Sequence, residues 1–265
     1  MLVSNDDKSG SFANMRKERS TPLKVIYTLV FLWVILSLLA FSFMDEKSVL
    51  RLTMEDGVVE SAGAVFFLLA SIVFMISFLR SRPGNDFFMW KTKRNLFFLV
   101  LSLLFFVACG EEISWGQRML SIRAPEYFQS HNIQKEINIH NLQPFHRLDD
   151  KGEEKGFVSL LLNIDRLFSA FWFSYVVLIP LGEKYSKKIS GCLRKINVPL
   201  PPLEIGFLFV VNYAMEKFME HWYKADFSQP LTEIKETNFA LLFLLLGCYF
   251  FWCQKKGSER TFSVS

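Results

Sequence analysis

Glu216 is the carboxylate in this sequence whose position most strongly indicates a functional role. It lies well inside an apolar stretch that runs from Leu203 to Tyr223. If this stretch is a transmembrane helix, Glu216 lies deep within the hydrocarbon layer, which is roughly 30 Å thick. A charged side chain there costs about 3 kcal/mol or more, so we expect Glu216 to face a polar cavity inside the protein.

Other polar residues recur on the same face of this stretch. Asn212, Glu216 and Glu220 follow one another at intervals of four residues, and His221 borders their face. Lys217 is adjacent and could neutralise Glu216. The face could therefore be part of a functional site, or it could hold an ion pair that only fixes helix packing.

A second group of charged residues lies where the apolar run 95–110 ends. Glu111 and Glu112 close the run, and Arg118 follows six residues after Glu112. If the helix continues, Glu111, Ser114, Trp115 and Arg118 fall on one face, while Glu112 turns to a neighbouring face. Arg118 could then pair with a carboxylate by a charge-assisted hydrogen bond. The alternative is a helix-end ion pair at the membrane interface.

Two further segments contribute polar side chains. Glu60 lies one turn into the second apolar run, where Gly63 allows close approach of another helix. The segment 119–156 carries three histidines, whose spacing matches no standard zinc signature. If this segment is helical, its polar stripe consists of Asn132, Glu136 and His140, with Asn141 directly after it.

Carboxylates and imidazoles gathered at a membrane surface suit two kinds of chemistry. They can bind a divalent metal that activates water, or they can act as a general acid and base. The candidate catalytic residues are Glu111, Glu112, Arg118, His140 and Glu216. The candidate metal ligands are Glu112, His140, Glu220 and His221. Further members of the site are Glu60, Glu136, Asn141 and Asn212. These donors fit zinc, iron or manganese alike, so the sequence does not identify the metal.

The composition predicts a polytopic membrane protein of the all-α class. The 265 residues include 29 Phe, 51% are hydrophobic, and the mean hydropathy is +0.24. We expect a helix bundle with one transmembrane domain over 22–256, a disordered leader over 1–21 and a tail over 257–265. The six predicted spans are about 25–44, 57–79, 95–117, 163–182, 203–223 and 237–254.

The distribution of charge predicts the orientation of the bundle. Most of the 30 Lys and Arg residues lie in the termini and in alternate short connections, which the positive-inside rule assigns to the cytoplasm. Both termini are then cytoplasmic, and the loop 119–156 lies on the outer, periplasmic face of an inner membrane. The basic residues act as orientation signals, so we expect membrane lipids and not nucleic acid as partners. The four cysteines have no framework spacing, and no disulfide scaffold is expected.

Parts of the chain resemble known membrane proteins. The segments Gly110 to Arg118 and Asn132 to Asn141 resemble a signature of an uncharacterised family of bacterial multi-pass membrane proteins, and Asp56 to Glu60 resembles the start of its second span. This resemblance covers about half the chain and implies a six-span-like fold. CAAX-processing-type proteases are similar in their Glu-Glu pair, but their Arg follows after four residues. Alkaline ceramidase-like hydrolases are similar only in architecture.

The leading hypothesis is an inner-membrane hydrolase or transferase, with or without a metal, acting on a lipid or lipid-linked substrate at the outer leaflet. Glu111 and Glu112 would act as ligands or base, His140 and His221 as ligands or acid, and Arg118 as an anion clamp. Two alternatives stay open. The protein could be a proton- or ion-coupled transporter component with Glu60 and Glu216 as intramembrane sites. It could also be an assembly or sensing protein, in which the carboxylates would be satisfied in pairs.

Overall fold

The computed structural model describes residues 6–40, 43–54, 57–81, 94–145, 163–222 and 228–262, and this part of the chain is mainly helical, with no named strand. The long helices are α1 (Asp6–Ala40), α3 (Val58–Arg80), α4 (Leu96–Glu112), α10 (Leu203–Trp222) and α11 (Ser228–Phe262). The shorter ones are α2 (Glu46–Thr53), α5 (Glu126–His131), α7 (Ile164–Phe173), η4 (Ser174–Leu178), α8 (Ile179–Tyr185) and α9 (Lys187–Lys195). The predicted all-α class is confirmed.

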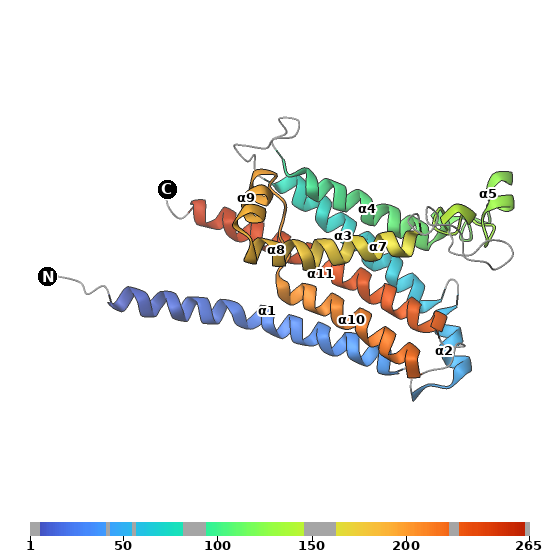
Figure 1. Ribbon diagram of the computed structural model, residues 1–265, viewed down its shortest axis with the longest axis horizontal. Helices are drawn as coiled ribbons and strands as arrows, with labels where there is room; N and C mark the ends of the chain where they lie inside the picture. Colours follow the sequence, from blue (N-terminus) through green and yellow to red (C-terminus); the bar gives the residue numbers. More distant parts are fainter. Residues whose placement is uncertain are drawn as a thin grey trace.

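Within the described residues, four helical segments are long and apolar enough to cross a membrane. They are Leu23–Ala40, Glu46–Arg80, Ile164–Tyr185 and Ser228–Gln254. Helix α4 has 17 residues and lies beside α3, and α10 contacts α1 and α11 (Figure 1). The side chain of Asn95 begins α4 by accepting a hydrogen bond from Phe97 N at 3.0 Å, as an N-cap residue does.

The long helices run alternately up and down, so the bundle has two distinct ends (Figure 1). Both chain termini and α9 lie at one end, and α2 and α5 lie at the other. We call these the terminal end and the α5 end. The first turn of α3 and the last turns of α4 and α10 all lie at the α5 end. As a result, the residues that the sequence predicted to act together are brought to the same end of the bundle.

Phenylalanines fill the interior between α3, α4, α10 and α11. The ring centroids of Phe105 and Phe243 are 4.5 Å apart, and those of Phe209 and Phe243 are 4.8 Å apart. Gly63 of α3 lets α11 approach closely, because a Cβ at Gly63 would lie 3.2 Å from Thr237 Oγ1. Thr237 also donates to Val59 O at 2.9 Å. The close helix approach predicted at Gly63 is therefore present.

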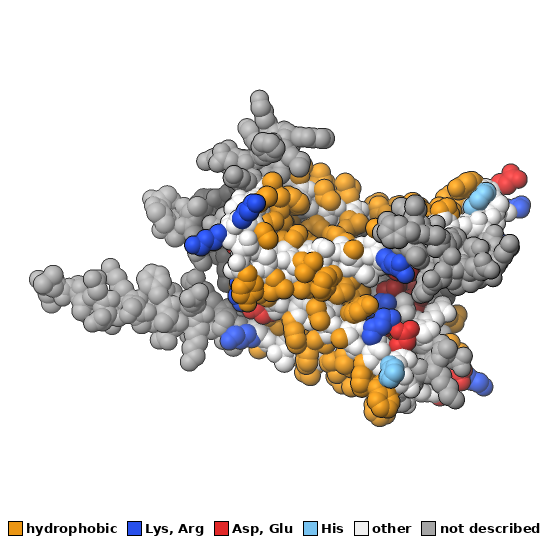
Figure 2. Space-filling view, viewed as in Figure 1, with side chains coloured by type: hydrophobic (Ala, Val, Ile, Leu, Met, Phe, Trp, Pro, Cys, Tyr) orange, Lys and Arg blue, Asp and Glu red, His pale blue; other side chains and the backbone are white. Residues whose placement is uncertain are grey.

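Apolar side chains cover the outside of the bundle between its two ends (Figure 2). On α1, Val25, Leu29, Trp33 and Leu36 are each more than half exposed. In this view, charged side chains lie mainly towards the two ends, with Lys and Arg at the terminal end and a mixture of acidic and basic residues at the α5 end (Figure 2). An apolar surface of this kind is typical of a protein that faces lipid.

The segment from α7 to α8 is one continuous helix that widens in its middle. Pro180 has no N–H, so Val176 O cannot accept the usual helical bond from residue 180, and η4 is a π turn at this point. Gly206 of α10 packs against the same carbonyl, since a Cβ at Gly206 would lie 2.3 Å from Val176 O. The irregular helix is therefore matched by a glycine on its neighbour.

Several predicted boundaries differ from the structure. The third span was expected to continue to residue 117, but α4 ends at Glu112. Helix α1 already begins at Asp6, within the leader predicted to be disordered, and α11 continues to Phe262, past the predicted end of the domain. Extending an existing helix needs no new nucleation, which favours such continuation beyond the apolar run. Part of the predicted outer loop, 146–156, lies outside the described residues.

Candidate functional site

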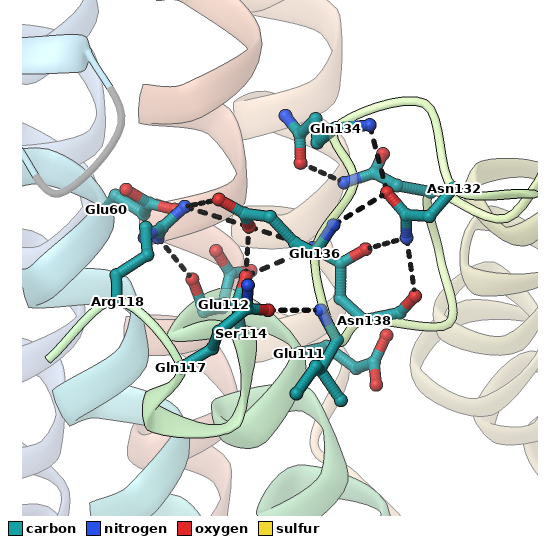
Figure 3. A network of polar contacts seen from close by, with 12 residues as sticks. Glu60, Glu111, Glu112, Ser114, Gln117, Arg118, Asn132, Gln134, Glu136 and Asn138 are labelled. Carbon is teal, nitrogen blue, oxygen red and sulfur yellow. Dashed lines mark hydrogen bonds and ion pairs between the residues drawn. The ribbon is translucent and has the colours of Figure 1, made fainter. Parts of the chain in front are cut away.

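The polar side chains at the α5 end form two groups. The first, which we call the Arg118 centre, joins α3, the end of α4 and the loop 132–142 (Figure 3). The second, the Glu216 centre, lies between α10, α11 and α1. The Arg118 centre consists of Glu60, Glu111, Glu112, Ser114, Gln117, Arg118, Asn132, Glu136, Asn138 and His140. The Glu216 centre consists of Ser37, Asn212, Glu216, Lys217, Lys235 and Asn238.

Arg118 connects two carboxylates that come from distant parts of the chain. Its Nη2 lies 3.1 Å from Glu60 Oε1, and its Nη1 lies 3.1 Å from both carboxylate oxygens of Glu136. Nη2 also donates to the backbone oxygen of Glu112 at 3.3 Å. All three charged side chains are at least four-fifths buried. The guanidinium therefore ties the loop to α3 and to the end of α4 with charge-assisted hydrogen bonds.

A left-handed turn after α4 puts Arg118 in this position. Ser114, Trp115 and Gly116 have φ values of 45°, 54° and 77°. Such conformations cost about 1–3 kcal/mol for each residue other than glycine, so neighbouring contacts must hold them. The shared face of Glu111, Ser114, Trp115 and Arg118 required the helix to continue, and this condition is not met, because α4 ends at Glu112 and the left-handed turn follows.

Trp115 and Gly110 hold the turn against the helix. The indole ring folds back over Gly110, where a Cβ would lie 2.9 Å from three ring atoms, so only glycine fits without a shift. The indole Nε1 donates to Glu111 Oε1 at 2.8 Å. The Ser114 hydroxyl donates to Glu136, and Asn138 Nδ2 donates to Ser114 Oγ at 3.1 Å.

The loop 132–142 is not the helix that a polar stripe predicted. Asn132 organises it instead: its Nδ2 donates to Asn138 O and to Asn138 Oδ1 at 2.8 Å, and its Oδ1 accepts from Gln134 N at 2.9 Å. Ile133 N donates to Asn141 O at 3.0 Å. Asparagine side chains that bond their own backbone compete with helix formation, which explains why the predicted stripe of Asn132, Glu136 and His140 does not form.

Glu111 holds the far side of the same loop. Its Oε2 accepts hydrogen bonds from Ile139 N at 2.5 Å and His140 N at 2.9 Å, and it lies 3.3 Å from His140 Nδ1. The other ring nitrogen of His140, Nε2, accepts from Asn141 Nδ2 at 2.9 Å. This pairing leaves Nδ1 to carry the proton that His140 donates to Glu111. Glu111 and His140 are therefore occupied in fixing the loop.

Glu112 differs from the carboxylates around it. Its side chain is partly buried, and it accepts no hydrogen bond from any of the residues that the structure describes. The charged groups that act most strongly on its carboxyl group are the carboxylates of Glu236, Glu233, Glu60 and Glu111. Glu112 thus lies at the C-terminal end of α4 among other acidic side chains, inside a frame that is held by hydrogen bonds (Figure 3).

Glu216 is only 1% exposed, as its position in the apolar stretch predicts. Lys217 Nζ and Lys235 Nζ each lie 3.5 Å from one of its oxygens. Asn212 shares the buried face, donates to Lys235 O at 2.8 Å and accepts from Asn238 Nδ2 at 3.1 Å. This centre therefore joins α10 to α11 by a buried charge group and an amide pair.

The predicted metal ligands are not brought together. Within the described ranges, no three His, Cys, Asp or Glu side chains are grouped so that they could hold a metal ion. Glu112 and His140 belong to the Arg118 centre, whereas Glu220 pairs with Lys217 at 2.6 Å on the exposed side of α10 and His221 lies against the Trp222 ring. Glu220 and His221 are exposed on α10, whereas Glu112 and His140 lie at the end of α4 and in the loop 132–142, so the four side chains do not form a metal site.

The sequence reasoning missed several residues of both centres. Gln117 and Asn138 hold the loop, and Lys235 and Asn238 complete the Glu216 centre. Asn238 carries a usable signal, because a buried amide inside the last apolar run requires a hydrogen-bond partner. Asn138 carries none, since a short polar residue in a loop is ordinary.

Comparison with protein-family models, with curated proteins and with solved structures finds no match for this chain.

Proposed function

We propose that this protein is an integral membrane enzyme that performs acid–base chemistry on a lipid or lipid-linked substrate at one face of the membrane. The site is the Arg118 centre, and Glu112 is the acid–base residue. The observation that supports it is the contrast between Glu112, whose carboxylate accepts no hydrogen bond from the described residues, and its neighbours, which are fixed in pairs.

This arrangement suits proton transfer for a physical reason. A general acid or base must be held within reach of a substrate, yet its own carboxylate must be free to exchange a proton. The hydrogen-bonded frame of Arg118, Glu60, Glu136 and Glu111 holds Glu112 in place, which meets the first condition. A carboxyl without hydrogen-bond donors meets the second. Glu112 is also surrounded by other carboxylates. Carboxyl groups placed close to like charges are common at catalytic sites.

The proposed substrate class follows from the location of the site. The Arg118 centre lies directly after the end of α4, and exposed apolar side chains, among them Val107 on α4 and Met119 next to Arg118 in the sequence, lie on the same segment. A substrate whose tail remains among the lipids would present its polar group at this level. No metal-dependent step is included, because the predicted ligand set is not assembled.

The test is a lipid analysis of cells that carry the gene, of cells from which it is deleted, and of deletion cells that express variants at equal levels. Glu112→Gln keeps the size of the side chain and removes its acid–base function, so we expect turnover to fall by roughly a hundredfold or more. The lipid profile should then match that of the deletion. Glu126→Gln on α5, the same change at an exposed position of the outer loop region, should restore the normal profile.

A second function is favoured by the pairing of the other carboxylates. Glu60 and Glu136 form ion pairs with Arg118, and Glu216 lies 3.5 Å from both Lys217 and Lys235. Such pairing is what an assembly or sensing protein with a rigid docking loop requires. The same experiment separates the two functions. If the deletion leaves all lipids unchanged, or if Glu112→Gln cells are indistinguishable from wild type, the enzyme proposal is wrong and the docking role is favoured.

A further inference from the structure

Aromatic pairs between α4 and α11 repeat at intervals of seven residues. The two helices run antiparallel (Figure 1). The ring centroids of Phe98 and Phe250 are 5.6 Å apart, and those of Phe105 and Phe243, seven residues nearer the α5 end on each helix, are 4.5 Å apart. Seven residues are close to two helical turns, so the paired side chains lie on one face of each helix.

The next pair in this series consists of Glu112 and Glu236. Glu112 lies seven residues after Phe105 and is the last residue of α4, and Glu236 lies seven residues before Phe243, within α11. Because both positions are still helical, the register of the ring pairs places the two carboxyl groups at facing positions. In agreement with this register, Glu236 is the charged residue that acts most strongly on Glu112.

A layer of phenylalanine rings lies on the terminal-end side of this pair. The ring centroid of Phe168 on α7 is 5.7 Å from that of Phe239 and 6.1 Å from that of Phe243. Phe105, Phe239 and Phe243 are each at most 2% exposed. The layer separates the two carboxyl groups from the terminal end, which suits an enzyme site at one face of the membrane better than a pathway through it.

The surroundings of the two carboxyl groups differ. Lys235 Nζ lies 3.9 Å from Glu236 Oε1, which gives this carboxylate a cationic partner. Glu112 accepts no hydrogen bond from the described residues, and the strongest charges around it are carboxylates. Two carboxyl groups in such different surroundings can serve as acid and base in one reaction. The other charged groups that act on Glu236 are Asp165 of α7, His140 of the loop and Glu216 of α10.

We propose that Glu236 is a second acid–base residue of the site, acting as the base while Glu112 acts as the acid. This inference rests on the function proposed for Glu112. In one turnover, Glu236 takes the proton of an attacking water or hydroxyl group, whose oxygen forms a bond to the electrophilic centre of the substrate. The bond to the leaving group breaks, and the leaving group takes the proton of Glu112. Return of the proton from Glu236 to Glu112 then restores both groups.

Reconstituted protein tests this assignment. Vesicles made from the total lipid extract of cells that lack the gene supply the substrate, and mass spectrometry follows the lipid species that the wild-type protein consumes. We expect Glu236→Gln to slow this conversion by roughly a hundredfold or more, as Glu112→Gln does. The double variant should be about as slow as either single variant, because residues that act together in one step are not additive.

Glu233→Gln is the matched control. It removes the same charge one turn earlier on α11, outside the seven-residue register, and should slow conversion far less than Glu236→Gln does. The melting temperature of each variant in detergent is measured first. If Glu236→Gln is destabilised, Glu236→Asp replaces it, since a carboxylate shortened by one methylene group loses its reach. Conversion by folded Glu236→Asp should then be about tenfold slower or worse.

The outcomes separate the two levels of the proposal. Wild-type conversion in Glu236→Gln, or in folded Glu236→Asp, together with loss in Glu112→Gln, overturns the role of Glu236 and leaves that of Glu112. An equal loss in Glu233→Gln and Glu236→Gln also overturns it, because the charge of α11 in general would then matter. Full conversion by Glu112→Gln, or no lipid consumed by the wild-type protein, refutes the proposed function itself.

Discussion

Single residues at the α5 end decide whether a carboxylate is structural or free to react. Glu111 and Glu112 are adjacent in the sequence, yet Glu111 accepts bonds from the loop backbone and Trp115, whereas Glu112 accepts none from the described residues. The difference arises because adjacent residues on a helix point to different faces. Only one of these faces meets the loop 132–142. A pair of identical residues therefore has two different roles.

Arg118 gives the sharpest prediction at this scale. Replacing it with Gln leaves Glu60 and Glu136 as buried carboxylates without their shared cation, so we expect a loss of roughly 3 kcal/mol of stability, a magnitude typical of breaking a buried ion pair. The measurement is thermal unfolding of the purified protein in detergent. Arg123→Gln is the matched control, because Arg123 is exposed and contacts Gln129. A melting temperature for Arg118→Gln equal to that of this control would contradict the bridging role.

At the scale of the elements, close helix contacts depend on irregular backbone and small residues together. The π turn of η4 and Pro180 leave the Val176 carbonyl without its usual helical hydrogen bond, and Gly206 lets α10 pack against this carbonyl. At the other end, three consecutive left-handed residues after α4 turn the chain back on itself, with Gly110 making room for Trp115. Both features replace a regular helix with a specific contact to a neighbour.

Gly206 provides the test for this arrangement. In Gly206→Ala, the added Cβ would lie 2.3 Å from a backbone oxygen that no side-chain rotation can move, so α10 must shift from η4. We expect a loss of about 2 kcal/mol or more, which exceeds the gain in helix propensity of about 1 kcal/mol. Gly191→Ala on α9 is the control, since a Cβ there meets nothing within 4 Å. Thermal unfolding should show Gly206→Ala destabilised and Gly191→Ala unchanged or stabilised; equal effects would count against the close contact.

At the scale of the whole molecule, polar chemistry and chain termini are separated by an apolar middle. The two polar centres lie towards the α5 end, and the chain termini and α9 lie at the terminal end (Figure 1). If the bundle spans a membrane, its two polar ends face the aqueous compartments on opposite sides. The basic residues of the terminal end would then face the cytoplasm.

Cysteine labelling tests this orientation. Cys192 on α9 is exposed at the terminal end, and Ser130 on α5 is exposed at the other. We expect a membrane-impermeant maleimide to label Ser130→Cys in intact cells, and to label Cys192 only after the membrane is permeabilised. Cys192→Ser identifies the labelled thiol. Labelling of both sites in intact cells, or the reverse order, would show that the predicted topology is wrong.

The sequence alone was sufficient to predict an all-helical membrane-type protein and the end at which its polar residues meet. Long apolar runs force helices because backbone groups in lipid must bond within their own segment. Because successive helices run in opposite directions, Glu60, Glu111 and Arg118 come to lie at one end of the bundle. The burial of Asn212 and Glu216 also follows from their spacing in an apolar run.

Only the tertiary structure decided which of these residues pair. Arg118 binds Glu60 and Glu136 instead of Glu111, because the left-handed turn at Ser114 to Gly116 reverses the chain. Helical periodicity cannot anticipate such a turn, since it is stabilised by a loop that lies about twenty residues further along the chain. The division into the Arg118 centre and the Glu216 centre likewise depends on how separate segments pack together. The side-chain partners of a buried charge are chosen by packing between segments, and local sequence spacing does not contain that information.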